Sequence, residues 1–253
     1  MKLTEFTHWL NQVLDPNKFK DYCTDGLNVE ASDTVTHIVT GVSFRESLVD
    51  KAIEKGADAI IVHHPHGLWN NEPRMPVGPL ARKLRKLLTH GISLYAFHLP
   101  LDGQPEFGNN AEIARILGLQ VQRGFMQEGQ ATIGCIGTYE KSLTKQNFLD
   151  KVNAVFPHGI ENAFMNGSDQ IQNVALCSGG GTSGIREALA LGVDTFFTGE
   201  IHESTPIFSE EEGFNLVACG HHRTEIFGVR ALAAKIQKEL NIPAEFIDID
   251  NPI

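Results

Sequence analysis

The sequence predicts an α/β protein made of two related lobes, with a small α+β insertion between them. Three observations favour this fold class. Continuous apolar runs alternate with amphipathic stretches in the first half of the chain, which is typical of parallel strands covered by helices on both faces. The same alternation returns near the end of the chain. A stretch of different character separates the two, so we expect three segments: 1–123, 124–171 and 172–253.

The first lobe begins with an amphipathic helix in TEFTHWLNQVL (4–14), whose apolar residues follow helical spacing. Apolar runs then predict strands over 36–42, 57–62 and 92–97. Apolar residues at helical spacing predict helices over 44–55, 78–89 and 109–119. In the insertion, ATIGCIGTY (131–139) predicts a strand and KQNFLDKVNAVF (145–156) predicts a helix.

The second lobe repeats the pattern of the first. Residues 38–64 align with residues 174–200 over 27 positions without a gap. Identical residues fall at matching positions, among them the pairs Gly56 and Gly192, and Asp58 and Asp194. We infer an internal duplication. Chance similarity is the alternative, because the helix–strand patterns of βαβ units resemble one another.

The charge balance disfavours some partners. The chain has 21 Lys and Arg against 31 Asp and Glu, a net charge of −10, whereas nucleic acids and anionic membranes require a basic surface. The cluster from Arg82 to Lys86 is more simply a solvated helix face. No apolar run approaches the roughly 18 residues of a membrane span. The four cysteines lie far apart without a C-x-x-C motif, so we expect reduced thiols in a cytoplasmic protein.

Histidines gather at the ends of the predicted strands. Seven of the eleven fall in four short segments: 63–66, 98, 202 and 221–222. Each segment follows an apolar run, and ligands of open α/β sheets bind beyond the carboxyl ends of the strands. The sequence therefore predicts that these imidazoles face one crevice.

Two acidic residues accompany the histidines at equal spacing. Asp102 follows His98 by four residues, and Glu225 follows His221 by four, in equivalent places of the two lobes. Imidazole nitrogens and carboxylate oxygens suit Zn²⁺, Fe²⁺, Mn²⁺, Co²⁺ or Ni²⁺. Carboxylates from opposite lobes could bridge two ions about 3.5–4 Å apart. The alternative is a set of hydrogen-bonded structural histidines. Three others are weaker candidates, as ligands, substrate-facing groups or exposed side chains: His66, His202 and His222.

A glycine-rich stretch, CSGGGTSG (177–184), joins a predicted strand to a helix. It resembles a phosphate-binding turn, because backbone N–H groups at a helix N-terminus attract anions. It lacks the Gly-Lys-Ser/Thr of a Walker A motif. The simpler interpretation is a tight turn that lets the backbone pass close to the metal site.

These stretches resemble the successive motifs of the GTP cyclohydrolase 1 type 2 homologue family, also called the NIF-three-like family. The motifs occur in the family's order over nearly the whole chain: IIVHHPHGLW, YAFHLPLDGQPEFGNNAEIARILGL, CSGGG, FFTGEIHEST and ACGHHRTEIFGVRAL, with DGLNVE at the start. The resemblance implies a two-lobed α/β fold, a dinuclear metal site in the cleft between the lobes, and a toroidal homohexamer.

The resemblance also implies site residues. The family's metal ligands match five positions that the pattern had already selected: His63, His64, Asp102, His221 and Glu225. His98 and Glu200 lie in the same motifs, and we expect them to be catalytic residues that carry protons. One departure is His66, where many members have an apolar residue.

The function that the sequence favours is that of a metal-dependent hydrolase. Two divalent ions per chain would polarise the substrate and activate water. A nucleotide or phosphoester is the expected small-molecule substrate, although no guanine pocket is evident. The alternative is a non-catalytic metal carrier or a regulatory metal-binding module. A third hypothesis, a ring that encircles nucleic acid, is disfavoured by the net charge.

Overall fold

The computed structural model describes residues 1–72, 75–156 and 158–253, and the chain divides into two compact units. The first unit consists of Met1–Leu101 and Gly228–Asp250, and the second of Asp102–Phe227 and Asn251–Ile253. Each unit contains one mixed sheet flanked by helices, so the predicted α/β class is confirmed. The unit boundaries differ from those of the three predicted segments, which stay a prediction of the domain organisation.

The first unit is built on a five-stranded sheet in the order β1-β4-β3-β2-β11. The strands are β1 (Gly26–Val29), β2 (Ile38–Ser43), β3 (Ala59–His64), β4 (Ser93–Ala96) and β11 (Ala244–Phe246). Strands β11, β2, β3 and β4 are parallel to one another, and β1 lies antiparallel to β4 at the edge. The predicted strands of the first lobe are therefore the centre of this sheet.

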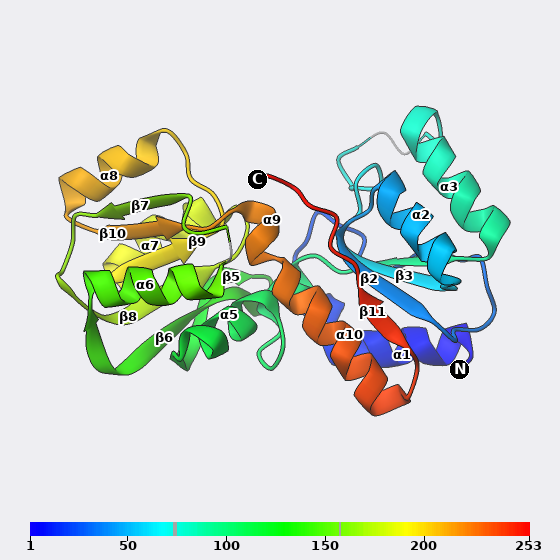
Figure 1. Cartoon of the computed structure of the whole chain (residues 1–253), viewed down its shortest axis with the longest axis horizontal. Helices are drawn as coiled ribbons and strands as arrows, with labels where there is room; N and C mark the ends of the chain where they lie inside the picture. Colours follow the sequence, from blue (N-terminus) through cyan, green and yellow to red (C-terminus); the bar gives the residue numbers. More distant parts are fainter. Residues whose placement is uncertain (73–74, 157) are drawn as a thin grey trace. The chain divides into compact units, whose positions relative to one another are not determined.

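Helices cover both faces of the first sheet (Figure 1). They are α1 (Leu3–Leu14), α2 (Glu46–Lys55), α3 (Gly78–His90) and α10 (Ile226–Leu240), with a short helix at Pro16–Lys18. Helices α2 and α3 pack with Val39 and Ile60 in one core. On the other face Phe6 of α1 contacts Tyr95, and Thr40 donates to the carbonyl of Val229 in α10. Burial on both faces explains why these strands are apolar throughout.

The second unit is built on a six-stranded sheet in the order β5-β6-β8-β9-β10-β7. The strands are β5 (Gln120–Glu128), β6 (Ala131–Thr144), β7 (Asn162–Met165), β8 (Gln170–Cys177), β9 (Thr195–Thr198) and β10 (Asn215–Ala218). Strands β8, β9 and β10 are parallel, and the other pairs are antiparallel. The antiparallel strands come from the predicted insertion and the segment just before it.

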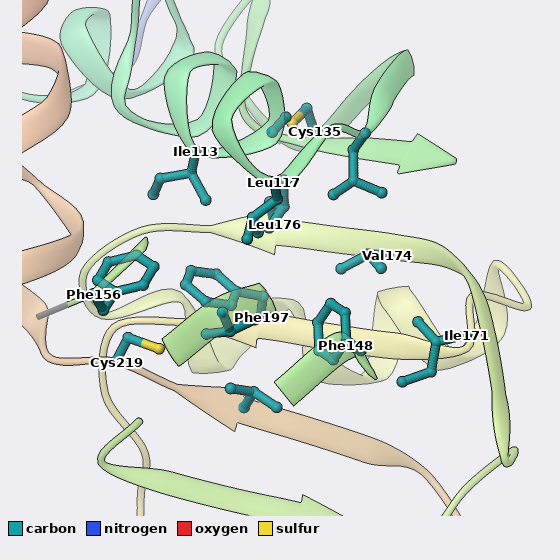
Figure 2. Close-up of a cluster of buried hydrophobic side chains, with 14 of the residues drawn as sticks. Ile113, Leu117, Cys135, Phe148, Phe156, Ile171, Val174, Leu176, Phe197 and Cys219 are labelled. Carbon is teal, nitrogen blue, oxygen red and sulfur yellow. The ribbon is translucent and has the colours of Figure 1, made fainter. Parts of the chain in front are cut away.

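Helices also pack on the two faces of the second sheet. They are α5 (Asn109–Leu117), α6 (Lys145–Val155), α7 (Ile185–Ala190), α8 (Ser204–Glu212), and the short helices at Leu99–Gly103 (α4), Gly181–Gly184 and His221–Thr224 (α9). Figure 2 shows the buried core of this unit, which joins Leu117 of α5 and Phe148 of α6 to Leu176 of β8 and Phe197 of β9. Helix α7 packs through Ile185 and Ala188 on the other face. This packing fixes the carboxyl ends of β8, β9 and β10.

Some predicted details were confirmed and others were wrong. The predicted strand over 57–62 was misplaced by two residues, because β3 runs from Ala59 to His64 and its ladder to β2 includes His64. The basic cluster on α3 is largely ion-paired, since Arg82 and Lys86 contact the carboxylate of Glu46 in α2. All four cysteines are free and buried. Among the described residues, no helix combines the length and apolarity needed to cross a bilayer.

Candidate metal centre

Three buried histidines meet in the first unit. His63 and His64 are the last two residues of β3, and His98 follows β4, which is parallel to β3 and ends at the same edge. One ring nitrogen from each lies within 4.8 Å of the others. Their ring centroids are 4.5–5.5 Å apart. This three-histidine group has the donor type and spacing to hold a divalent ion.

Hydrogen bonds fix the protonation of two of these rings. His63 Nδ1 lies 3.0 Å from the carbonyl oxygen of Phe97, and His98 Nδ1 lies 3.0 Å from a carboxylate oxygen of Asp21. Both partners are acceptors, so both Nδ1 atoms carry the proton. Nε2 is therefore the nitrogen that each ring presents as a ligand or base, an arrangement common around metal-binding histidines.

Asp21 is a site residue that the sequence analysis missed. Its carboxylate accepts from His98 Nδ1 and from the backbone N–H groups of Leu99 and Cys23. Burial acts to raise the pKa of Asp21, but the hydrogen bonds and the charge of His98 outweigh it and lower the pKa. No local pattern marks this aspartate, because 77 residues separate it from His98.

Aromatic side chains border the three-histidine group. The Trp69 ring centroid lies 5.2 Å from that of His98 and 5.7 Å from that of His64. Tyr22 lies 5.0 Å from His98, and Trp69 Nε1 donates to His66 Nδ1 at 3.4 Å. His66 is exposed, and its ring contacts those of Trp69 and His64, with centroids 6.0 Å and 5.7 Å away.

The loop after β3 is held by a buried lysine. Lys83 of α3 donates to the carbonyl oxygens of Phe44 at 2.8 Å and His66 at 2.6 Å. Burial lowers the pKa of Lys83 to about 8, against the opposing effect of the Glu72 and Glu46 carboxylates. The loop that follows the histidines is therefore tied to α3 by a group whose charge is costly.

The second unit brings together a carboxylate pair and an imidazole. Glu225 is buried directly after α9, and its Oε1 lies 3.2 Å from Nε2 of His221. The other nitrogen of His221 lies 3.1 Å from Glu200. Burial acts to lower the pKa of His221, but Glu225 and then Glu200 outweigh it and raise the pKa to about 9. In the protein without metal, His221 is thus an imidazolium that neutralises its acidic neighbours.

Asp102 is buried in α4 and held by two donors. Asn109 Nδ2 and Ser178 Oγ donate to its Oδ1 at 2.8 Å and 3.0 Å. Burial, and then the negative charges of Asp102 and Glu225, raise the pKa of the Cys177 thiol well above its usual value. A carboxylate oxygen of Asp102 and one of Glu225 lie within 4.8 Å of each other.

The glycine-rich turn passes directly beside these side chains. Gly179 has a φ of +60°, and a Cβ atom there would lie 2.1 Å from Glu225 Oε1 and 3.0 Å from His221 Nε2. At Gly180 a Cβ atom would lie 3.1 Å from Glu200 Oε1. The turn thus needs glycine so that the backbone can approach the carboxylates, which agrees with the simpler of its two interpretations. Its binding of phosphate stays a prediction.

The predicted site residues divide between the units. His63, His64 and His98 lie in the first, whereas Asp102, Glu200, His221 and Glu225 lie in the second. Of the weaker candidates, exposed His202 contacts the hydroxyl of Thr182, and buried His222 donates its backbone N–H to Ile253. The structure thus gives each unit its own set of potential ligands.

Comparisons with known proteins match the whole chain. The model of the family described as Duf34/NIF3 (NGG1p interacting factor 3) matches residues 1–252. The GTP cyclohydrolase 1 type 2 homolog of Haemophilus influenzae is 36% identical over 252 residues, and that of Escherichia coli is 38% identical over 255, each with 100% of both chains covered.

Solved structures agree with this match. A structure of a protein called ybgI, described as of unknown function, is 37% identical with a TM-score of 0.93. A crystal structure of a Thermus thermophilus protein is 33% identical with a TM-score of 0.89. Both alignments cover 100% of each chain. With a family model that matches residues 1–252 and full-length relatives of 36–38% identity, the chain belongs to the Duf34/NIF3 family.

Proposed function

We propose that this protein binds two divalent metal ions and uses them for hydrolysis. His63, His64, Asp102, His221 and Glu225 are the proposed ligands. The observation that carries the proposal is the buried pair His63 and His64, whose ring nitrogens lie within 4.8 Å of each other and of His98, the proposed base beside them. The buried carboxylates of the second unit supply oxygen donors of the kind that the same metals accept.

The donor chemistry fits a metal ion on the evidence of the side chains alone. His63 and His98 present Nε2 because their Nδ1 atoms are committed to hydrogen bonds. His221 contacts two carboxylates, and a divalent ion would replace its proton as their counter-charge. When bound, such an ion acts as a Lewis acid that polarises the substrate and lowers the pKa of water.

With metal bound, residues of this chain would transfer protons and hold the ligand side chains in position. His98 is suited to accept a proton at Nε2, because Asp21 stabilises the imidazolium that results. Glu200 is half-buried beside His221 and is the second proposed proton carrier. Asn109 and Ser178 hold Asp102 in one orientation through its Oδ1.

An internal duplication is part of the proposal, because it would give each lobe an equivalent carboxylate, Asp102 and Glu225. The strand registers support it: Ile38 pairs with Ala59 between β2 and β3, and Val174 pairs with Thr195 between β8 and β9. All four positions correspond in the gapless alignment of the two halves.

Hydrogen bonds at aligned positions support the duplication further. Asp58 accepts from the backbone N–H groups of residues 36 and 37, and its counterpart Asp194 accepts from those of residues 172 and 173. The aligned Gly56 and Gly192 both have a φ near +70°, just after α2 and shortly after α7. Equivalent residues thus make equivalent local contacts in the two units.

The substrate class that we propose is a nucleotide or another phosphoester. The relatives' name, GTP cyclohydrolase 1 type 2 homolog, makes GTP one compound to include. The competing proposal is a metal carrier or regulatory metal-binding module without turnover. We further propose a homohexamer in which each chain completes its own metal site.

The test is elemental analysis of the purified protein, followed by a screen of the metal-loaded form against nucleotides and phosphoesters. We expect two ions per chain and turnover that a chelator abolishes. His63→Ala should lose metal, whereas His8→Ala, an exposed histidine on α1, is the matched control and should retain it. His98→Ala should retain metal and lose turnover. Metal that exchanges readily without any turnover would favour the carrier, and wild-type protein that takes up no metal would exclude both proposals.

A further inference from the structure

We propose that Tyr22, His66 and Trp69 form a binding surface, the aromatic rim, for the flat aromatic ring of a phosphorylated substrate. This inference rests on the proposed function, since it names the substrate class of the same site. The rim lies entirely in the first unit, next to the three-histidine group. A ring bound there would place an attached phosphate close to the imidazoles.

The rim is continuous from exposed rings to buried ones. The ring centroids of Tyr22 and Trp69 lie 5.3 Å apart at an interplanar angle of 34°. Trp69 then contacts both His64 and His98, at 5.7 Å and 5.2 Å. Its other neighbour is His66, at 6.0 Å. A ligand ring on the rim is therefore one aromatic contact away from two proposed metal-site residues.

The exposure of Tyr22 is the second observation. Its side chain is 55% exposed, and it is the only aromatic among the exposed large hydrophobic residues in the part of the chain that the structure describes. Aromatic rings bury large areas when they are covered, and they prefer offset or tilted stacking on another ring. An exposed ring beside a buried polar group is thus a favourable place for a planar ligand.

The rim is also held in place before any ligand arrives. The backbone N–H of Asn70, next to Trp69, donates to the carbonyl of Tyr22 at 3.0 Å. The backbone N–H of Trp69 donates to Glu72 at 3.3 Å, and Asp21 is anchored by His98. Preorganised side chains lose little entropy on binding, so stacking contributes more to the affinity.

The polar groups beside the rim are engaged with one another. Asp21, the carboxylate next to Tyr22 in sequence, is already paired with His98. His66 accepts at Nδ1 from Trp69, so its ring proton is on Nε2. An aromatic or heteroaromatic ring with acceptor atoms matches these groups.

The test compares phenyl phosphate with methyl phosphate, which share the phosphate and differ in the ring. Trp9→Phe leaves Trp69 as the sole tryptophan, so fluorescence reports the rim directly. We expect phenyl phosphate to quench Trp69 and to bind roughly fivefold or more tightly than methyl phosphate, the ratio that one aromatic stack provides. Tyr22→Phe should keep this preference, and Tyr22→Ala should abolish it. Leu88→Ala, which removes an equally exposed apolar side chain from α3, should keep it.

Equal affinity for the two phosphates, no quenching by millimolar phenyl phosphate, or an unchanged preference in Tyr22→Ala would each overturn the inference. The titrations are run on metal-loaded and chelator-treated protein, with metal content measured on the same samples. Loss of the ring preference in a protein that holds its metal refutes the rim alone. Wild-type protein that takes up no metal refutes the proposed function, and a ring preference that persists in that protein supports the rim.

Discussion

Replacing Gly179 by alanine tests whether the glycine-rich turn sets the position of the Glu225 carboxylate. The added Cβ atom would lie 2.1 Å from Glu225 Oε1, whereas ordinary contacts begin at 3.4 Å. The buried carboxylate must therefore retreat from its place, and its contact with His221 must lengthen. Gly192→Ala is a matched control, because Gly192 has a φ of +71° and no atom lies within 4 Å of its added Cβ.

The size of the effect follows from two contributions. In both variants the left-handed conformation costs alanine about 1–2 kcal/mol, and a less flexible unfolded chain offsets about 0.4–1 kcal/mol of this. Only in Gly179→Ala is a buried polar group displaced from its partner, which costs about 1–3 kcal/mol. The free energy of unfolding should thus be about 1–3 kcal/mol lower than that of Gly192→Ala, a difference in Tm of roughly 2–12 °C.

The assay is scanning calorimetry together with a metal titration of both variants. A misplaced ligand should weaken metal binding about 10–100-fold in Gly179→Ala, as disturbed neighbours of metal ligands typically do. Gly192→Ala should bind metal like the wild type. If the two variants unfold at the same temperature and bind metal equally, the turn does not position Glu225 and the reasoning fails.

Four further predictions follow from the same structure. Asp102→Ala and Glu225→Ala should each lose more metal per chain after gel filtration than His63→Ala, because a bridging carboxylate serves both ions; near-full occupancy in either carboxylate variant would contradict bridging. Metal should be released in acid below about pH 6.5, where ligand imidazoles protonate, and unchanged metal content at about pH 4 would exclude these ligands. Lys83 has a pKa of about 8 when folded and about 10.5 when unfolded, so the unfolded chain binds its proton more tightly. The free energy of unfolding of the wild type relative to Lys83→Met, measured with denaturant, should therefore rise by about 3 kcal/mol between those pH values. A difference that does not change with pH would refute the shift. Arg85→Glu, on the exposed face of α3, should leave the metal content unchanged by elemental analysis, whether or not light scattering shows a smaller assembly. A folded variant that loses both its assembly and its metal would mean that chains share the site.

The parts of the fold that the sequence predicted are those with a local pattern. Strands β2, β3 and β4 are buried on both faces, so their apolar runs are unbroken. The misplaced start of β3 has a local cause, because Asp58 uses its carboxylate to accept from the backbone N–H groups of residues 36 and 37. It therefore belongs to the turn before the strand. At the other end, the polar residues His63 and His64 ended the apolar run, although both belong to β3.

The missed strands lack such a pattern. The first five residues of β5 (Gln120–Glu128) are all exposed, so no alternation of apolar and polar residues marks this edge strand. The short strands β1 and β11 pair with partners far away in the chain. Sequence periodicity reports burial, and edge strands with little burial leave no periodic signal.

The candidate site divides in the same way. His63, His64 and the spacing of His98 to Asp102 were visible because they lie at the end of a buried strand or just after one. Asp21 was not, since its role depends on a pairing across 77 residues that no short motif records. The aromatic contacts of Tyr22 were hidden for the same reason, because they join loops that only the folded first unit brings together.

The discontinuous first unit has a consequence for synthesis on the ribosome. Strand β2 lies between β3 and β11, and Thr40 on it donates to Val229 of α10. Both α10 and β11 are translated only after the whole of residues 102–227. At typical elongation rates this delay is on the order of 10 s. The nascent first unit therefore waits with an open strand edge and an uncovered apolar face, while the second unit, nearly continuous in the chain, has all but its last three residues available to fold first.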